Sequence, residues 1–296
     1  MPRDYTLEQL HQWCSVPADE LPGHGDLKIP LRIVADSAEM GEAMARELVQ
    51  EVAAHNAAGE PTRAIVPCGP MAWYEPFTKI VNAERVSLND LHVYHMDECL
   101  DWQGRLLPAG HPYNFRATMG RVFYGGTDEA LAVPPGQRHF ITPENCRELA
   151  ETIAGVRIDI TLGGWGQDGH VAYNQARREP YSATSAEELA ASTARVQYNN
   201  LDTVIALAQR SFGSGYQFVP PMSVTLGMSE CLSGRKVRLF SDTGAWKQTA
   251  LRVALFGPVT PEYPMTLLQR HDDALLTATR ETASHPIAEN PEWELL

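Results

Sequence analysis

The chain has few features that would tie it to a membrane, a disulfide framework or a zinc site. No apolar run approaches the roughly 20 residues that a helix needs to cross a bilayer, and residues 1–13 lack the apolar core of a secretion signal. The cysteines number 5, an odd count, at wide spacings without a C-x-x-C pair. This pattern favours free thiols in a reducing cytoplasm over disulfides or bound zinc.

Positive charge is also scarce. The 24 lysines and arginines face 37 aspartates and glutamates, so the formal net charge is −13. Basic residues form no cluster beyond short pairs such as Arg177 and Arg178. The sequence therefore predicts no nucleic-acid partner and no membrane partner. An acidic protein that binds an anion must build a local positive site. Basic residues near glycine-rich loops are therefore the stronger candidates for anion binding.

The remaining composition is that of a globular protein with a sizeable core, with 296 residues of which 44% are hydrophobic and 21% charged. From residue 29 onward, strand-like runs alternate with helical patterns. Alternation of this kind predicts one α/β domain over residues 29–296, with a Rossmann-like, mostly parallel sheet flanked by helices on both faces. Residues 1–28 are predicted to be an accessory segment that packs on this domain or on a neighbouring subunit. The polar stretch 178–193 is interpreted as a lid.

A glycine-rich loop follows the run 156–162, which is predicted to be a central strand. Residues 162–175 read LGGWGQDGHVAYNQ. Clustered glycines are expected where the backbone turns sharply and passes close to a ligand. An acid beside a histidine, here Asp168 and His170, can hold the imidazole in one tautomer for proton transfer. A solvated polar loop is the alternative, but the glycines and the preceding strand favour a site.

Three more loops are predicted at the same sheet edge, because ligands of such folds bind at the carboxyl ends of the strands. They are residues 67–71, 97–100 and 242–247. Adjacent strand residues face opposite ways, so only one of Asp97 and Glu98 can enter a given pocket. A carboxylate at a strand end is well placed as a general base, although a helix cap or a solvated turn is the alternative.

Two basic residues are candidates for binding an anion. Lys247 lies in the first turn of a predicted helix, where free N–H groups and the helix dipole favour a phosphate. An ordinary surface lysine is the alternative. Arg210 lies near the end of its predicted helix, where it can also serve only as a partner of the helix dipole.

Three segments resemble the glucosamine-6-phosphate deaminase (isomerase) family. LGGWGQDGHVAYNQ resembles its signature L-G-x-G-x-D-G-H-I-A-F-N-E-P, HMDECL resembles M-D-E-Y, and TGAWKQTAL resembles G-x-x-K-A-x-A. Their order and spacing agree, and the resemblance extends over about residues 29–278. The D-G-H motif alone also fits the related 6-phosphogluconolactonases, whereas M-D-E together with G-H-x-A-[FY]-N favours the deaminases.

The resemblance implies a role for each matching residue. His170, oriented by Asp168, would open the pyranose ring at its oxygen, and Gln175 occupies the place of a family glutamate. Asp97 would move a proton between C2 and C1 of the open sugar, after which ammonia leaves by hydrolysis without metal or cofactor. Lys247 would hold the 6-phosphate. The residues expected to contact this small sugar phosphate are Gly69, Glu98, Gly164, Gly166, Lys247 and, after a one-residue insertion, Arg210. The family also suggests a homo-oligomer.

Two departures from the family pattern bear on activity. Gln175 replaces a glutamate and can only form hydrogen bonds, so ring opening is expected to be slower or the sugar to differ. The loop Cys68-Gly69-Pro70-Met71 replaces Gly-Gly-Thr-Pro, and Pro70 has no N–H to donate. Phosphate binding by this loop is expected to be weaker. Either other basic residues compensate, or the anion lies elsewhere; the basic residues in question are Lys247, Arg210, Arg177 and Arg178.

Other functions remain open from the sequence. The same scaffold could carry a sugar-phosphate isomerase or a 6-phosphogluconolactonase-like hydrolase, neither of which releases ammonia. A sugar-phosphate-binding regulator that has lost catalysis is a third reading. The presence of Asp97, Asp168 and His170 argues against a regulator, because a protein that only binds has little need of proton-transfer groups. Trp165 is bulky for its place in the glycine loop and is expected to narrow the pocket.

Overall fold

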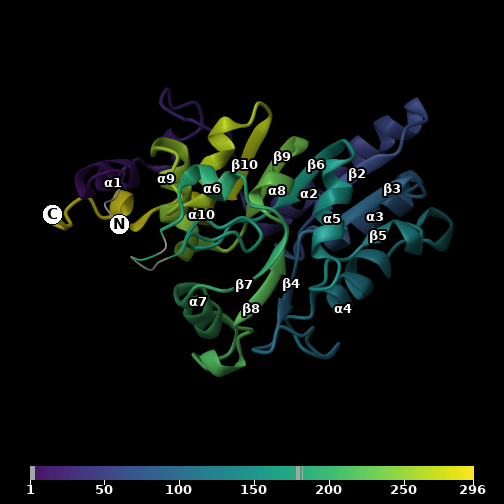
Figure 1. Cartoon of the computed structure of the whole chain (residues 1–296). Helices are drawn as coiled ribbons and strands as arrows, with labels where there is room; N and C mark the ends of the chain where they lie inside the picture. The colour runs from purple at the N-terminus through teal and green to yellow at the C-terminus, as the bar shows by residue number, and fades with distance from the viewer. Residues whose placement is uncertain (1–3, 178–180, 182) are drawn as a thin grey trace.

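A parallel sheet forms the centre of the computed structural model, which describes residues 4–177, 181 and 183–296 (Figure 1). Its order is β1-β10-β9-β6-β2-β3-β5, and every neighbouring pair is parallel. The strands are β1 (Leu31–Val34), β2 (Thr62–Val66), β3 (Leu91–His95), β5 (Arg138–His139), β6 (Ile158–Gly163), β9 (Gly234–Ser241) and β10 (Ala274–Thr279). The prediction of a Rossmann-like, mostly parallel sheet is confirmed.

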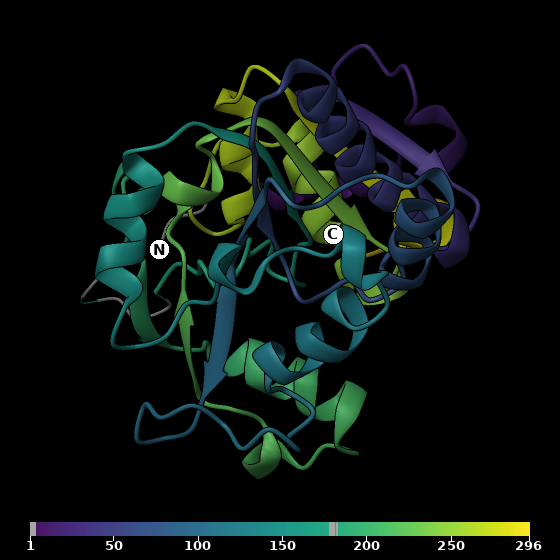
Figure 2. The same cartoon turned by 90° about the vertical axis from the view of Figure 1, so that its right-hand side faces the viewer.

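Helices cover both faces of this sheet because successive strand residues point to opposite sides. Figure 2 shows helices on both sides of the sheet. In β2, Ala64 and Val66 join the hydrophobic cluster under α2 and α3, whereas Ile65 joins the cluster under α5, α8 and α9. The helices are α1 (Leu7–Cys14), α2 (Ser37–Ala58), α3 (Tyr74–Glu84), α4 (Phe115–Met119), α5 (Cys146–Ala154), α6 (Ala186–Ala190), α7 (Leu201–Ser211), α8 (Met228–Cys231), α9 (Gln248–Phe256), α10 (Arg280–Ala283) and α11 (Pro286–Glu289). No helix in the described part of the chain is long and apolar enough to span a bilayer.

A second, smaller sheet was not expected from the sequence. It has the order β4-β8-β7 with antiparallel neighbours, and it lies beside α7 below the first sheet in Figure 1. Its strands are β4 (Asp97–Leu100), β7 (Arg195–Tyr198) and β8 (Met222–Thr225). The prediction of a loop at residues 97–100 is therefore wrong. The chain leaves the first sheet after the amide of Met96, which donates to the Val66 carbonyl, and Asp97 then pairs with Thr225.

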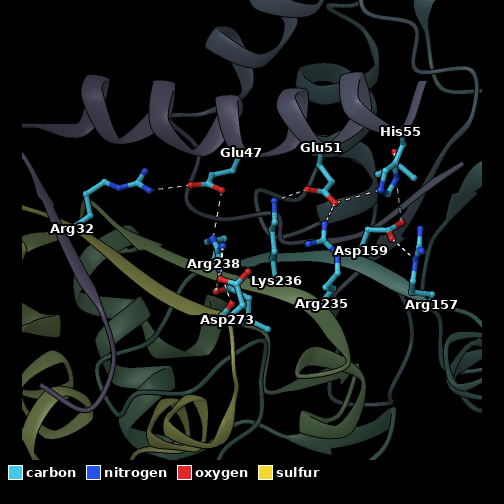
Figure 3. A network of polar contacts seen from close by, with 12 residues as sticks. Arg32, Glu47, Glu51, His55, Arg157, Asp159, Arg235, Lys236, Arg238 and Asp273 are labelled. Atoms are coloured by element: carbon cyan, nitrogen blue, oxygen red, sulfur yellow. Dashed lines mark hydrogen bonds and ion pairs between the residues drawn. The ribbon is translucent and has the colours of Figure 1, made fainter. Parts of the chain in front are cut away.

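Ion pairs attach α2 to the amino ends of the parallel strands (Figure 3). The buried Glu51 accepts hydrogen bonds from Arg235 and, at 2.7 Å, from Lys236 Nζ. Nearby, Arg157 Nε donates to the buried Asp159 at 2.8 Å. These contacts hold α2 at the amino ends of the strands. The carboxyl ends, on the opposite side, are left to the loops that follow the strands.

The N-terminal segment packs along α9 in the described part of the chain. The Lys28 amide donates to the Leu255 carbonyl at 2.8 Å, and the Lys28 ammonium donates to the Gly257 carbonyl at 2.7 Å. Arg252 Nη2 donates to the Val16 carbonyl at 2.9 Å. The sequence left two packing partners open for this segment, the α/β domain and a neighbouring subunit. The contacts of the segment in the described part of the chain are with the domain of the same chain. Its separation from residues 29–296 as an accessory unit stays a prediction.

Candidate active site

One cleft of about 780 Å³ lies at the carboxyl ends of the parallel strands. It will be called the central cleft, and it is lined by the segments that follow β2, β3, β6 and β9, together with α7 and the α4 region. Of the residues that the sequence singled out, the cleft is lined by Gly69, Asp97, Gly164, Gly166, His170, Arg210 and Lys247. Glu98, Asp168 and Gln175 lie outside its lining. Loops far apart in the sequence thus meet at the carboxyl ends of the parallel strands, as predicted.

The imidazole of His170 is held by a buried carboxylate. His170 Nδ1 lies 2.6 Å from Asp168 Oδ1, and the ring stacks on Tyr173 with centroids 5.8 Å apart and planes 14° apart. Because an ionised carboxylate can only accept, the proton is assigned to Nδ1. This leaves Nε2 of His170 as the nitrogen that can exchange a proton with a ligand in the central cleft.

The glycines of the loop make room for this ring. A Cβ atom at Gly166 would lie 2.1 Å from His170 Cε1, so any side chain there would displace the imidazole. Gly169 has φ of +69°, in the left-handed region that glycine adopts without strain. The turn is closed by hydrogen bonds between the Gly166 amide and the His170 carbonyl and between the Gly169 amide and the Gly166 carbonyl, both 3.0 Å.

Asp97, the first residue of β4, presents a half-buried carboxyl to the central cleft. Burial raises the pKa of Asp97 to about 8, and the neighbouring charge of Glu98 acts in the same direction. The carboxyl is therefore largely protonated at neutral pH in the free protein. A pKa near the working pH suits a group that must both take and give a proton.

Glu98 faces away from the cleft, as the alternation of strand residues requires. Its buried carboxylate accepts hydrogen bonds from the amides of Cys99 at 3.0 Å, Phe115 at 2.8 Å and Arg116 at 2.7 Å. Glu98 thus anchors the start of α4, where free amides favour a negative charge. Glu98 was predicted to contact the substrate, and the structure places it elsewhere. The amides of Phe115 and Arg116 that bind it belong to α4, which follows a long loop, so this partner could not be identified from the sequence.

Two cationic groups lie together at one end of the central cleft. Lys247 Nζ is 5.2 Å and Arg210 Cζ 5.4 Å from the ring centroid of Trp246. Burial lowers the pKa of Lys247 to about 7, and the charge of Arg210 adds to this effect. Neither residue forms an ion pair within the described part of the chain. Two unpaired cations in an acidic protein provide a local site for an anion.

Comparison with known proteins places these groups in a family. No family model matches the chain. Curated glucosamine-6-phosphate deaminases from Pectobacterium carotovorum and Serratia proteamaculans are each 30% identical to it over 255 residues, covering 84% of this chain and 88% of theirs. The chain belongs to the glucosamine-6-phosphate deaminase family. The resemblance seen in the three sequence motifs is confirmed.

Solved structures agree on the fold. A monomeric glucosamine-6-phosphate deaminase superimposes with a TM-score of 0.72 at 20% identity, covering 86% of this chain and 99% of that one. A 6-phosphogluconolactonase from Trypanosoma cruzi gives a TM-score of 0.61 at 17% identity, covering 88% and 98%. At these identities the likeness concerns the fold, which the deaminase family shares with the lactonases.

Gln175, the first departure from the family pattern, lies buried behind Asp168. Its Nε2 donates to Asp168 Oδ2 at 3.0 Å and to Thr203 Oγ1, and its Oε1 accepts from the Asn200 amide at 2.9 Å. Gln167 Nε2 also donates to Thr203 Oγ1, at 2.9 Å. Sequence reasoning missed Thr203, which belongs to no motif and reaches the site only because the start of α7 packs there.

The second departure, the loop 67–71, forms one wall of the central cleft. A Cβ at Gly69 would meet open space, so the backbone there is open to a ligand. Of the arginines expected to compensate for this loop, Arg177 lines a different cavity together with Arg195, and Arg178 lies outside the described residues. Trp165 is buried and lines the cleft as expected, while its indole N–H donates to the Lys247 carbonyl at 3.4 Å.

Proposed function

We propose that this chain is a glucosamine-6-phosphate deaminase that converts a phosphorylated amino aldose into the ketose and releases ammonia. The observation that carries the proposal is the meeting of three groups in one cleft. These are the Asp97 carboxyl, the His170 imidazole held by Asp168, and the cations Lys247 and Arg210. Family membership supports the same reaction.

Ring opening is assigned to His170. His170 Nε2 takes the proton of the C1 hydroxyl and delivers it to the ring oxygen as the C1–O5 bond breaks, which leaves an aldehyde at C1 and a hydroxyl at C5. Asp168 stabilises the charged imidazole and holds it in one orientation, because its carboxylate accepts the Nδ1 proton at 2.6 Å. The hydrogen bond from Gln175 to the second carboxylate oxygen fixes Asp168 in turn.

Proton transfer between C2 and C1 is assigned to Asp97. The carboxylate removes the C2 proton to give an enolamine and returns a proton to C1, which leaves an imine at C2 of the ketose. Water then adds to the imine and ammonia departs, so the deaminating step consumes one water and is hydrolytic. The cationic amino group of the substrate favours the ionised form of Asp97, and the phosphate favours the charged form of Lys247. The scheme assigns the proton transfers to protein side chains and the deaminating step to water.

The test is an NMR assay with glucosamine 6-phosphate in deuterated water. We expect fructose 6-phosphate, ammonia and deuterium at C1 to appear together. Isomerisation or C2 exchange without ammonia would instead support a sugar-phosphate isomerase. Binding without any change in the sugar would support a regulator. Asp97→Asn and His170→Ala should each abolish turnover while the fold is retained, and turnover in either variant would contradict the role assigned to that residue.

Compartment and assembly are further parts of the proposal. We propose the reducing cytoplasm, supported by the five cysteines, all of which are free thiols. A homo-oligomer stays a prediction from the family resemblance, and the solved deaminase with a TM-score of 0.72 is described as monomeric. Light scattering separates the two, because a species of 32.7 kDa in solution would contradict the oligomer.

A further inference from the structure

One wall of the central cleft is a helical segment that no family motif includes. It consists of α4 and the π-helical turn Gly120–Tyr124 that continues it. Phe115, Thr118, Arg121 and Val122 line the cleft from this segment, and their spacing places them on one face of a helix. A π-helical turn inside a helix is frequent at functional sites.

Among the described residues that line the cleft from this wall, Arg121 is the one with a positive charge. Its Nη2 donates to Thr118 Oγ1 at 3.3 Å, and it forms no ion pair with another described residue. Burial raises the pKa of the Cys68 thiol, and the nearby charge of Arg121 acts in the opposite direction. Arg121 thus lies close to the loop 67–71 and retains donors for a ligand.

The wall and the loop are joined by buried contacts. The Tyr74 hydroxyl bonds to the Cys68 carbonyl and lies 2.9 Å from Met119 Sδ. The rings of Phe77 and Phe123 stack with centroids 4.9 Å apart. These contacts hold Arg121 and Thr118 beside the loop in which the chain lacks the family's threonine and has proline without an N–H.

We propose that Arg121, together with the Thr118 hydroxyl, binds the phosphate monoester of the substrate in place of the donors that this loop lacks. A guanidinium suits this task because its fixed fork of N–H groups matches two oxygens of one phosphate. Lys247 and Arg210 lie on other segments of the same cleft, so the phosphate is held between cations on more than one wall. The sugar's identity rests on the proposed function, but phosphate recognition does not.

The test is a calorimetric titration of the full chain with inorganic phosphate, glucosamine 6-phosphate and glucosamine. Arg121→Gln should weaken binding of both phosphate-containing ligands about 10- to 100-fold, as expected for losing hydrogen bonds to a charged group. Binding of glucosamine should not change. Arg121→Lys should recover part of the loss, since it restores charge without the fork. Thr118→Val should cause a smaller loss.

Arg116→Gln is the matched control. Arg116 belongs to the same helix, but its guanidinium lies 4.9 Å from the Phe140 ring centroid and outside the cleft lining. The proposal would be overturned if Arg121→Gln bound phosphate as well as Arg116→Gln does. It would also be overturned if the wild-type protein did not bind phosphate. Phosphate binding that depends on Arg121 without turnover would instead refute only the deaminase function. Turnover with a KM unaffected by Arg121→Gln would refute only the phosphate contact.

Discussion

Gln175 Nε2 donates a hydrogen bond of 3.0 Å to Asp168 Oδ2, the carboxylate oxygen that does not bind His170. An ionised glutamate in this place could not donate to that oxygen. The substitution therefore does more than remove a charge, because it supplies a neutral donor that holds the orienting acid. From the sequence alone, the change indicates a lost charge, and with it either slower ring opening or a different sugar.

Gln175→Glu is expected to lower kcat about tenfold or more near neutral pH, the effect of losing a hydrogen bond to a charged group. The new carboxylate would lie against Asp168 without a proton to donate. The loss should shrink as the pH falls, since a protonated glutamate regains a donor. The measurement is kcat from pH 5.5 to 8. A variant faster than the parent at neutral pH would support the sequence-based interpretation that the missing charge limits ring opening.

Thr203→Val is expected to lower kcat about tenfold, because the substitution removes the hydroxyl that accepts from Gln175 and Gln167. KM should change little if Thr203 acts only by positioning these amides. Thr203→Ser keeps the hydroxyl and should retain most activity. A rise in KM with unchanged kcat would show that the substitution displaces α7, which carries Arg210, and would contradict the positioning role.

Asp97→Asn is expected to abolish turnover and stabilise the fold above neutral pH. The pKa of Asp97 is raised to about 8 in the folded state, against an ordinary value of about 4. Between these values the folded state keeps a proton that the unfolded state releases, so this group lowers stability as pH rises from about 4 to 8. Thermal unfolding at pH 5, 7 and 8.5 should show a Tm advantage of the variant that grows with pH. A variant less stable than the parent at pH 8.5 would refute this account.

Phosphate affinity is expected to fall as the pH rises above about 7, because Lys247 has a pKa of about 7 in the free protein and then loses its charge. Glucose 6-phosphate is a suitable probe, since its phosphate is fully charged in this range and it has no amino group. Lys247→Arg should show a flatter profile from pH 7 to 9, because a guanidinium stays protonated. Equal pH profiles for the two proteins would exclude Lys247 as the titrating group.

The mostly parallel sheet and the loops that meet at the carboxyl ends of its strands could be predicted from the sequence, but the order of the strands was not predicted. Alternating periodicities and glycine-rich turns are local signals, so Asp97, His170 and Lys247 can be identified from the sequence alone. The second sheet was missed because residues 91–100, LHVYHMDECL, contain no glycine or proline to mark the change of partner at Met96. Pairing with β8 depends on residues more than a hundred positions away.

Side-chain partners were harder to predict than positions. The sequence indicated that Asp97 and Glu98 face opposite ways, but it could not show that Glu98 meets the amides of α4. Thr203 and Arg121 belong to no motif, and each enters the site through packing between segments distant in sequence. Such residues carry no local signal, because their function depends on which surface their helix covers.

Asp97 and Glu98 are adjacent in the sequence, and their carboxyl groups have different tasks. One faces the central cleft, and the other fastens the wall that bears Thr118 and Arg121. A register slip of one residue in β4 would exchange them, bringing the longer carboxylate into the cleft and leaving the shorter one to reach for the amides of α4. The proton transfer and the anchoring of α4 would then both be lost, so this strand tolerates neither an insertion nor a deletion before Asp97.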